Sequence, residues 1–502
     1  MPGARKSAKY IFFGNTFTRV ITFAASIALA RLLFPSDYGY LMMASVFSSF
    51  IGILANTGFE NFYLQEKIEN IQQKKMILSI TVKLRLMMNI FMFILQFILS
   101  YPVQHYYESE IVGQLLRILS VGYIINAFYQ VPLFVLRKKI DFRPEVYAGI
   151  AKGLVDSGTK VLFAYLGFGA LSFAYGSILG GIVFMLIIIK KSNETFDLKL
   201  WDQELFHKIF YFGKHYLVTG IGSYLSSYMD KIILMNNFNP HALGLYNFAF
   251  SQSDNIRAKT SRPMGKLIIS YIAKHKDDPE KIKNALWSMS YFELVFFTPI
   301  YIFLMFYADF IVVNIFGDKW LDAVPVIQVF LVYGLITSIY GASINILTGI
   351  GYPEIQSKLS LANLVVLIPV LLLISFLKGS IIDYAITYVV ITILYSVIKS
   401  GIGIIKLGYN PFVFFTSLKL GIFVIQNIIF SVSIALIISI FDKSMVGFIL
   451  AGILMLLLFI LFHLVIYRQY FFKSFSFLVN KEHKIYKLLT KISNILLQKG
   501  KI

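Results

Sequence analysis

The sequence of 502 residues contains no cysteine, and its 26 acidic residues are few beside 46 lysines and arginines. The absence of cysteine excludes a disulfide framework, a thiolate metal site and a cysteine nucleophile. The seven histidines are scattered and show no metal-ligand spacing, so no metal site is predicted. No set of residues indicates a catalytic site either, which leaves binding or transport as the expected activity.

Apolar residues are what the sequence has in excess. They make up 57% of the chain, the mean hydropathy is +0.72 and there are 48 phenylalanines, which indicates an all-α integral membrane protein. Stretches long enough to cross a hydrocarbon core of about 30 Å predict about 14 transmembrane helices. Their expected ranges are 10–33, 40–62, 76–100, 111–136, 146–167, 169–190, 209–236, 242–272, 285–307, 323–350, 357–378, 380–405, 413–440 and 445–467.

The positions of the cations predict the orientation. With a cytoplasmic N-terminus, the loops and tail on the cytoplasmic side carry roughly 28 lysines and arginines, against roughly 3 on the outer side. Both termini are therefore expected in the cytoplasm, with the chain in the cytoplasmic (inner) membrane. Because the cations gather at the membrane face and within spans, the net charge of +20 does not indicate nucleic-acid binding.

A short pattern after the first span recurs later in the chain. Pro35, Gly39 and Ala44 are matched at an offset of 205 by Pro240, Gly244 and Ala249. Each copy directly follows a predicted span that begins a run of six spans. This arrangement favours two similar halves around one cavity, as in many transporters. Polar residues at helical spacing in the first two spans support this hypothesis: Asn15, Arg19, Thr22 and Ser26, then Ser45, Ser49, Gly52 and Asn56.

Ionisable residues within spans are functional candidates by default, because an isolated charge in hydrocarbon is costly. The cations are Arg19, Lys83, Arg85, Lys152, Lys259, Arg262 and Lys266. Lys83 and Arg85 are two residues apart and cannot share a helix face, whereas Lys152 and Asp156 have the spacing of a neutralising pair. Arg19, Lys259 and Arg262 have no evident anion nearby in the sequence. Candidates for ion coupling or gating are Asp156, Asp230, Asp254 and Glu293.

Five stretches resemble the polysaccharide-exporting (Wzx-type) flippases of the multidrug/oligosaccharidyl-lipid/polysaccharide exporter superfamily. They are Ala30-Arg-Leu-Leu-Phe-Pro-Ser-Asp-Tyr-Gly39, Leu136-Arg-Lys-Lys-Ile-Asp-Phe-Arg143, Asp230-Lys-Ile-Ile-Leu234 with Leu243-Gly-Leu-Tyr246, Phe316-Gly-Asp-Lys-Trp-Leu-Asp-Ala-Val-Pro325, and Gly351-Tyr-Pro-Glu-Ile-Gln-Ser-Lys-Leu-Ser360. The resemblance implies two six-helix lobes plus two helices. The expected divisions are 1–195, 196–406, 407–467 and a basic cytoplasmic tail, 468–502.

The resemblance also implies a substrate, a polyprenyl diphosphate that carries an oligosaccharide. A cationic cavity suits a diphosphate, so the seven cations are predicted to bind it while the lobes alternate their access between the leaflets. The resemblance favours a gate or packing role for Asp230. No cofactor is predicted, apart from possible coupling of transport to H⁺ or Na⁺. Membrane lipids and enzymes of polysaccharide biosynthesis are candidate partners.

Two other functions stay open at this point. A small-molecule or drug antiporter of the same superfamily would need acidic residues in the cavity, and a membrane glycosyltransferase or polymerase would need paired carboxylates beside the membrane. Asp318 and Asp322, in a predicted outer loop of about 15 residues, match that second need poorly. Residues 484–496 have the pattern of an amphipathic helix on an anionic leaflet, or of an ordinary solvated basic tail.

Overall fold

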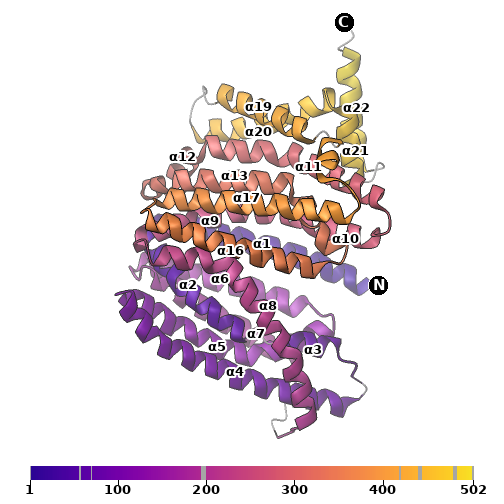
Figure 1. The fold of residues 1–502 in the computed structure, drawn as a ribbon. Helices are drawn as coiled ribbons and strands as arrows, with labels where there is room; N and C mark the ends of the chain where they lie inside the picture. The colour runs from indigo at the N-terminus through magenta and orange to yellow at the C-terminus, as the bar shows by residue number, and fades with distance from the viewer. Residues whose placement is uncertain are drawn as a thin grey trace. The chain divides into compact units, whose positions relative to one another are not determined.

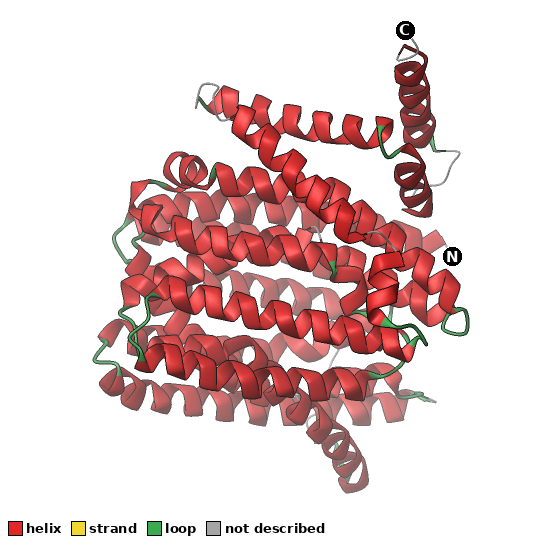
Figure 2. Cartoon of the chain, turned by 45° about the horizontal axis from the view of Figure 1, so that its top comes forward, coloured by secondary structure: helices red, strands yellow, loops and turns green. Residues whose placement is uncertain are grey.

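The structure is a computed structural model that describes residues 2–55, 58–68, 70–193, 199–259, 261–417, 420–438, 444–478 and 483–499. Within these ranges the chain is helical and contains no strand (Figure 2), so the prediction of an all-α protein is confirmed. Asn56 lies outside the described residues, and so does the side chain of Asn15.

The chain forms two compact units. Unit 1 comprises Met1–Asn247 and Ile315–Lys319, and unit 2 comprises Phe248–Asn314 and Trp320–Ile502. The boundary near residue 247 lies within one helix, α9 (Pro240–Lys259).

Unit 1 contains eight further helices, which Figure 1 shows in indigo to magenta. They are α1 (Pro2–Leu32), α2 (Pro35–Ala55), α3 (Phe59–Gln65), α4 (Ile71–Tyr106), α5 (Glu110–Lys138), α6 (Arg143–Tyr165), α7 (Leu171–Ser192) and α8 (Gln203–Met235). Helix α6 packs on α1 and α7, α5 packs on α4 and α7, and α2 lies against α5 and α8. The short α3 joins α2 to α4 and contacts α5, which places its polar residues beside the ends of three longer helices.

The repeated Pro and Gly residues meet in unit 1. A Cβ atom on Gly39 would lie 1.8 Å from the Pro240 carbonyl oxygen, and one on Gly244 would lie 1.7 Å from the Pro35 carbonyl oxygen. The first turns of α2 and α9 are therefore in reciprocal backbone contact. Only glycine allows this approach, which gives the repeated sequence pattern a physical reason.

Unit 2 continues with α10 (Ser261–Lys274) and α11 (Pro279–Phe306), and its helices run from magenta to yellow in Figure 1. The others are α12 (Ala308–Ile311), η1 (Val312–Phe316), η2 (Asp318–Ala323), α13 (Val324–Ile339), α14 (Gly341–Ile344), α15 (Ile346–Gly349), α16 (Pro353–Phe376), α17 (Ile381–Lys406), α18 (Pro411–Ser417), α19 (Leu420–Ile438), α20 (Met445–Val465), α21 (Arg468–Leu478) and α22 (Lys484–Lys499). Residues 308–322, predicted as a loop, thus form short helices.

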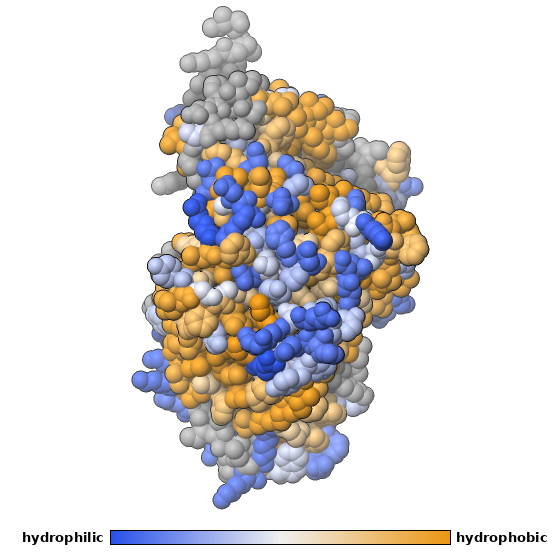
Figure 3. Space-filling view, turned by 90° about the vertical axis from the view of Figure 1, so that its left-hand side faces the viewer, coloured by the Kyte–Doolittle hydropathy of each residue, from blue (hydrophilic) through white to orange (hydrophobic). Residues whose placement is uncertain are grey.

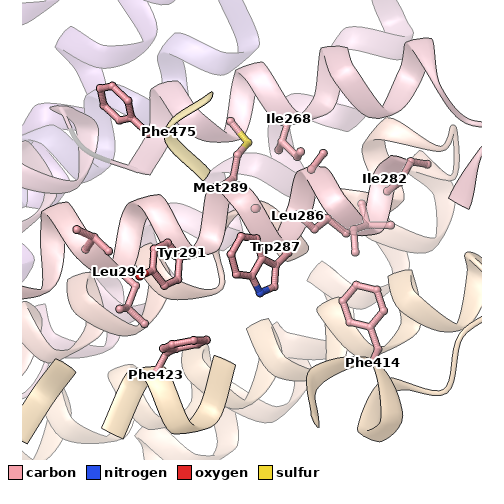
Figure 4. Close-up of a cluster of buried hydrophobic side chains, with 14 of the residues drawn as sticks. Ile268, Ile282, Leu286, Trp287, Met289, Tyr291, Leu294, Phe414, Phe423 and Phe475 are labelled. Carbon is pink, nitrogen blue, oxygen red and sulfur yellow. The ribbon is translucent and has the colours of Figure 1, made fainter. Parts of the chain in front are cut away.

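The core of unit 2 is built on α11, which packs against α13, α19, α20 and α21. In Figure 4, Trp287 and Tyr291 of α11 lie near Phe423 of α19, and the ring centroids of Tyr291 and Phe423 are 5.3 Å apart. Burial of such large rings provides much of the packing energy of the unit.

A buried polar network crosses this core. The Tyr291 hydroxyl lies 2.7 Å from Nδ1 of His463, and Nε2 of His463 lies 2.6 Å from Oδ1 of Asn427. The Asn427 amide nitrogen donates to the Phe423 carbonyl oxygen, so Oδ1 must accept. A neutral imidazole therefore carries its hydrogen on Nε2 and accepts the Tyr291 hydroxyl hydrogen at Nδ1. The network joins α19 and α20 to α11.

Nine of the described helical segments are long and apolar enough to cross a membrane. They coincide with nine of the predicted spans. Helices also occupy the other five expected ranges, in α1, α6, α8, α9 with α10, and α18 with α19. The total of about 14 crossings stays a prediction. Figure 3 looks at the helix ends, where groups of hydrophilic residues lie between areas of hydrophobic ones.

The range 242–272 is described as α9 up to Lys259 and as α10 from Ser261, and residue 260 lies outside the described residues. Another predicted span is not the continuous helix expected. The range 323–350 is divided into α13, α14 and α15, and the Asn345 side chain takes the Gly341 carbonyl oxygen that would continue the helix.

Gly39→Ala and Gly244→Ala should each destabilise the protein by about 3 kcal/mol or more, because the added methyl group meets rigid backbone that cannot rotate away. Thermal unfolding of the purified, detergent-solubilised protein measures the change. Gly158→Ala in α6 is the control, since nothing lies within 4 Å of its added Cβ. Equal melting temperatures for all three variants would contradict the contact.

Asn427→Leu should cost about 2 kcal/mol, because the Nε2–H group of His463 loses its acceptor in a buried site. Ser433 of the same helix is exposed and bonds only to the Ile429 carbonyl oxygen, so Ser433→Ala should change stability by less than about 0.5 kcal/mol. Thermal unfolding again makes the comparison. If both variants melt at the wild-type temperature, the network contributes nothing to holding α19 and α20.

Candidate functional site

A polar cavity of about 500 Å³ lies within unit 1, between α2, α3, α4 and α5. We call it the N-terminal polar cavity. Its wall includes three charged residues, Glu60, Arg85 and Arg137, and several neutral polar ones, chiefly Asn89, Tyr123, Asn126 and Gln130. Polar groups without water or protein partners are costly at membrane depth, so such a cavity is expected to hold water or a polar ligand.

One end of the cavity is lined by Arg137, near the C-terminus of α5, which forms ion pairs there. Its Nη1 lies 2.5 Å from Oε1 of Glu60 on α3, and its Nη2 and Nε lie 2.5 and 3.1 Å from the two carboxylate oxygens of Glu145 on α6. The contact with Glu145 is bidentate, the strong geometry for guanidinium and carboxylate. Arg137 thus ties together three helices and forms ion pairs with two acids.

Arg85 of α4 lies deeper in the wall and is only 4% exposed. Its guanidinium carbon is 5.2 Å from the centre of the Phe59 ring and 5.5 Å from that of Phe134. The two rings provide cation–π contacts for a charge that has left bulk water. The Arg85 side chain forms part of the cavity wall, and a guanidinium there is a suitable partner for an anionic ligand.

The other end of the cavity is neutral. The Tyr123 hydroxyl lies 3.0 Å from the Ser48 carbonyl oxygen and 3.2 Å from Oε1 of Gln96, and Gln96 donates to the Leu116 carbonyl oxygen. These bonds fix α2, α4 and α5 at this level. Oε1 of Gln130 is buried and has no hydrogen-bond partner in the part of the chain that the structure describes. A buried acceptor of this kind is the natural contact for a ligand hydroxyl.

A second cavity, of about 420 Å³, shares Arg137 with the first. Its wall is formed by Gly14 and Thr18 of α1, Glu145 and Gly149 of α6, and Phe184 of α7 among others. The Arg137 side chain and its two carboxylates therefore lie on the boundary of two hollow regions of unit 1.

The predicted cations of unit 1 have different environments. Arg19 and Lys152 are exposed, and the Lys152 ammonium lies 5.7 Å from the Phe184 ring centre. Lys83 donates to the Leu200 carbonyl oxygen at 2.9 Å, so it is occupied locally, while Arg85 lines the cavity. The expected Lys152–Asp156 pair is wrong: Asp156 pairs with Lys160 at 2.8 Å.

In unit 2 the expectation that Arg262 lacks an anion is also wrong. One of its terminal nitrogens lies 2.8 Å from both carboxylate oxygens of Asp254, which also bonds to Arg257 at 2.7 Å. Arg262 and Asp254 are eight residues apart, farther than the three or four residues at which neighbours on one helix face are expected, so the spacing does not predict this contact. Lys259 and Lys266 are exposed.

The two remaining acidic candidates are buried. Asp230 of α8 accepts a hydrogen bond of 3.0 Å from the Tyr246 hydroxyl of α9, a contact typical of helix packing. Glu293 of α11 is 0% exposed, and neither carboxylate oxygen has a hydrogen-bond partner among the described residues. Of the four acids, Glu293 therefore has the least local reason for its position.

Sequence reasoning missed several residues. Tyr123, Asn126, Gln130 and Arg137 are spaced i, i+3, i+7 and i+14, so the search that found the polar stripes of the first two spans would also have found this one. Lys399 of α17, 6% exposed, was missed because it lies near the end of a very apolar span. Its ammonium has no ion pair within the described ranges.

Comparison with known proteins connects this architecture to a family. Residues 28–325 match a family described as "Polysaccharide biosynthesis protein". The lipopolysaccharide biosynthesis protein WzxC of Escherichia coli is 20% identical over 360 residues, 70% of this chain and 71% of WzxC. The probable low-salt glycan biosynthesis flippase Agl15 of Haloferax volcanii is 22% identical over 416 residues, 81% of this chain and 85% of Agl15.

Among solved structures, the lipid II flippase MurJ in an inward closed conformation has a TM-score of 0.68 at 14% sequence identity. The match covers 90% of this chain and 98% of MurJ, which shows a common fold. Because the family match covers more than half of the chain, the protein belongs to the polysaccharide biosynthesis protein family, and the similarity to WzxC and Agl15 supports its resemblance to the Wzx-type flippases.

Proposed function

We propose that this protein moves a polyprenyl-diphosphate-linked oligosaccharide from the cytoplasmic to the outer leaflet for surface polysaccharide synthesis. The observation that carries the proposal is the buried Arg85 on the wall of a polar cavity, within a protein of this family. A guanidinium inside the membrane region is a suitable partner for a diphosphate, which offers several acceptor oxygens. Family membership supports transport and no catalytic step is assigned.

The proposed path begins at the cytoplasmic side. Arg137 and Glu60 belong to segments predicted to face the cytoplasm, so the charged end of the N-terminal polar cavity is the proposed entrance for the head group. The expected lobes, 1–195 and 196–406, then alternate their access while the polyprenyl chain stays in lipid. Arg19, Lys152, Lys259 and Lys266 are proposed as further contacts along the way. Lys83 and Arg262, which have local partners, are weaker candidates.

Glu293 is the proposed coupling residue. The other three acidic candidates bond to Lys160, to Tyr246, or to Arg257 and Arg262. A carboxylate that lacks such partners within a span must be neutralised by a proton or a cation, which is the step that coupling requires.

Replacing Arg85 should block export. In cells that depend on this protein, Arg85→Met should raise the cytoplasmic pool of lipid-linked glycan by about tenfold or more. The reason is that loss of the diphosphate contact removes about 1.4 kcal/mol or more of binding free energy. Methionine keeps the packing between Phe59 and Phe134, and Arg85→Lys should recover part of the activity by keeping the charge. Extraction and quantification of the lipid-linked glycan gives the result.

The matched control is Arg143→Met, since Arg143 is exposed and pairs only with Asp141 in the described structure. It should clear the intermediate as the wild type does. Normal clearance by Arg85→Met at wild-type membrane abundance would rule out the proposed contact. Sensitivity of the deletion strain to cationic drugs, without any accumulated glycan, would instead favour the antiporter alternative.

Glu293→Gln should remove the dependence of transport on an ion gradient. In proteoliposomes, we expect an imposed proton or sodium gradient to accelerate flipping by the wild type several-fold and to leave the variant at its basal rate, because a neutral amide neither titrates nor holds a cation. Asp156→Asn, which removes an acid already paired with Lys160, is the control and should keep the acceleration. A response of Glu293→Gln equal to that of the wild type would exclude this residue.

A further inference from the structure

The N-terminal polar cavity changes in character along its length. On α5, Arg137 and Tyr123 are 14 residues apart, which corresponds to about 21 Å along the helix. Arg85 packs against Phe134, so it lies toward the Arg137 end, and Asn89 follows it by one turn of α4. The charged groups are thus gathered at one end, and amides and a tyrosine hydroxyl form the other.

The neutral end has the chemistry of a sugar site. Asn89, Asn126 and Gln130 each offer an amide oxygen and an amide NH₂ group, and so they can bond to hydroxyl groups as acceptor and as donor. Among the described residues of the cavity wall, Glu60 is the only acid, and its carboxylate is engaged by Arg137 at the far end. The neutral end therefore suits an uncharged, hydroxyl-rich ligand.

Two features indicate that this end is built for a ligand rather than for packing. Oε1 of Gln130 is buried without a hydrogen-bond partner in the described part of the chain, so one acceptor on a residue of the cavity wall is unused. Asn89 and Tyr123, by contrast, are held by bonds to the Arg85 and Ser48 carbonyl oxygens. Fixed neighbours around a free acceptor give a site with defined geometry.

We infer that the N-terminal polar cavity selects the glycan: Asn89, Asn126 and Gln130 bind hydroxyl groups of the sugars nearest the diphosphate, and the diphosphate reaches Arg85. This inference rests on the proposed function and adds to it the residues that discriminate among glycans. A cavity of about 500 Å³ lies in the range of small-ligand sites, so it accepts a short glycan segment and leaves the rest of the oligosaccharide outside.

The test measures binding of two water-soluble probes to the purified full-length protein in nanodiscs, by calorimetry. One probe is the oligosaccharide released by mild acid from the lipid-linked intermediates of the cell, and the other is inorganic diphosphate. Gln130→Met and Asn126→Leu keep side-chain size and remove the amide. Each should weaken binding of the oligosaccharide by about tenfold and leave binding of diphosphate unchanged.

Gln114→Met is the matched control, since Gln114 lies on the same helix, outside the cavity, and bonds to Glu110. It should bind both probes as the wild type does. Arg85→Met should show the opposite pattern, with diphosphate binding weakened more than oligosaccharide binding. Only variants that melt at the wild-type temperature are compared. For each variant, the ratio of its affinity for the oligosaccharide to its affinity for diphosphate is used, because this ratio does not depend on the fraction of active protein.

Wild-type oligosaccharide affinity in both Gln130→Met and Asn126→Leu would overturn the inference, even if the protein flips lipid-linked glycan in proteoliposomes. Conversely, the wild-type protein could bind the oligosaccharide through these residues and yet flip no lipid-linked glycan. That result would support the glycan site and overturn the proposed function. A change in which glycan is exported by Asn126→Leu cells would support both.

Discussion

Inside a membrane region, a polar side chain is stable only where another polar group of the chain, water or a ligand faces it, and this constraint organises both units. Arg137 lies between Glu60 and Glu145, Asp254 between Arg257 and Arg262, and His463 between Tyr291 and Asn427. The sets around Arg137 and His463 join residues from different helices. The helix arrangement is therefore specified by pairs of polar groups as well as by apolar packing.

Two of the exceptions to this pairing lie where function is proposed. The N-terminal polar cavity keeps Gln130 Oε1 without a partner in the described structure, and Glu293 keeps both carboxylate oxygens in that condition. A group left in this state costs free energy in the resting protein, which a transported ligand or ion can recover. The same physical rule thus explains the stability of the paired sites and the binding capacity of the others.

Sequence reasoning predicted what depends on local pattern. Apolar stretches gave the helices, and the repeat of Pro35 and Gly39 at Pro240 and Gly244 turned out to mark a direct contact. The choice of partner for a charged side chain was beyond it. Lys152 and Lys160 each lie four residues from Asp156, and spacing does not decide which of them forms the pair. Arg262 lies eight residues from Asp254, farther than the spacing rule for one helix face considers. The polar face of α5 was readable by its spacing, but which of Lys83 and Arg85 faces the cavity depends on how α4 is rotated against its neighbours.

The shared position of Arg137 has a consequence for release as well as binding. This arginine lines both cavities of unit 1 and already holds two carboxylates of the protein. An arriving anion therefore gains only the difference between its own bonds and those it displaces, and the carboxylates are ready to return when it leaves. If the proposed substrate binds here, the two carboxylates compete with it for Arg137, and such competition favours rapid exchange over tight retention.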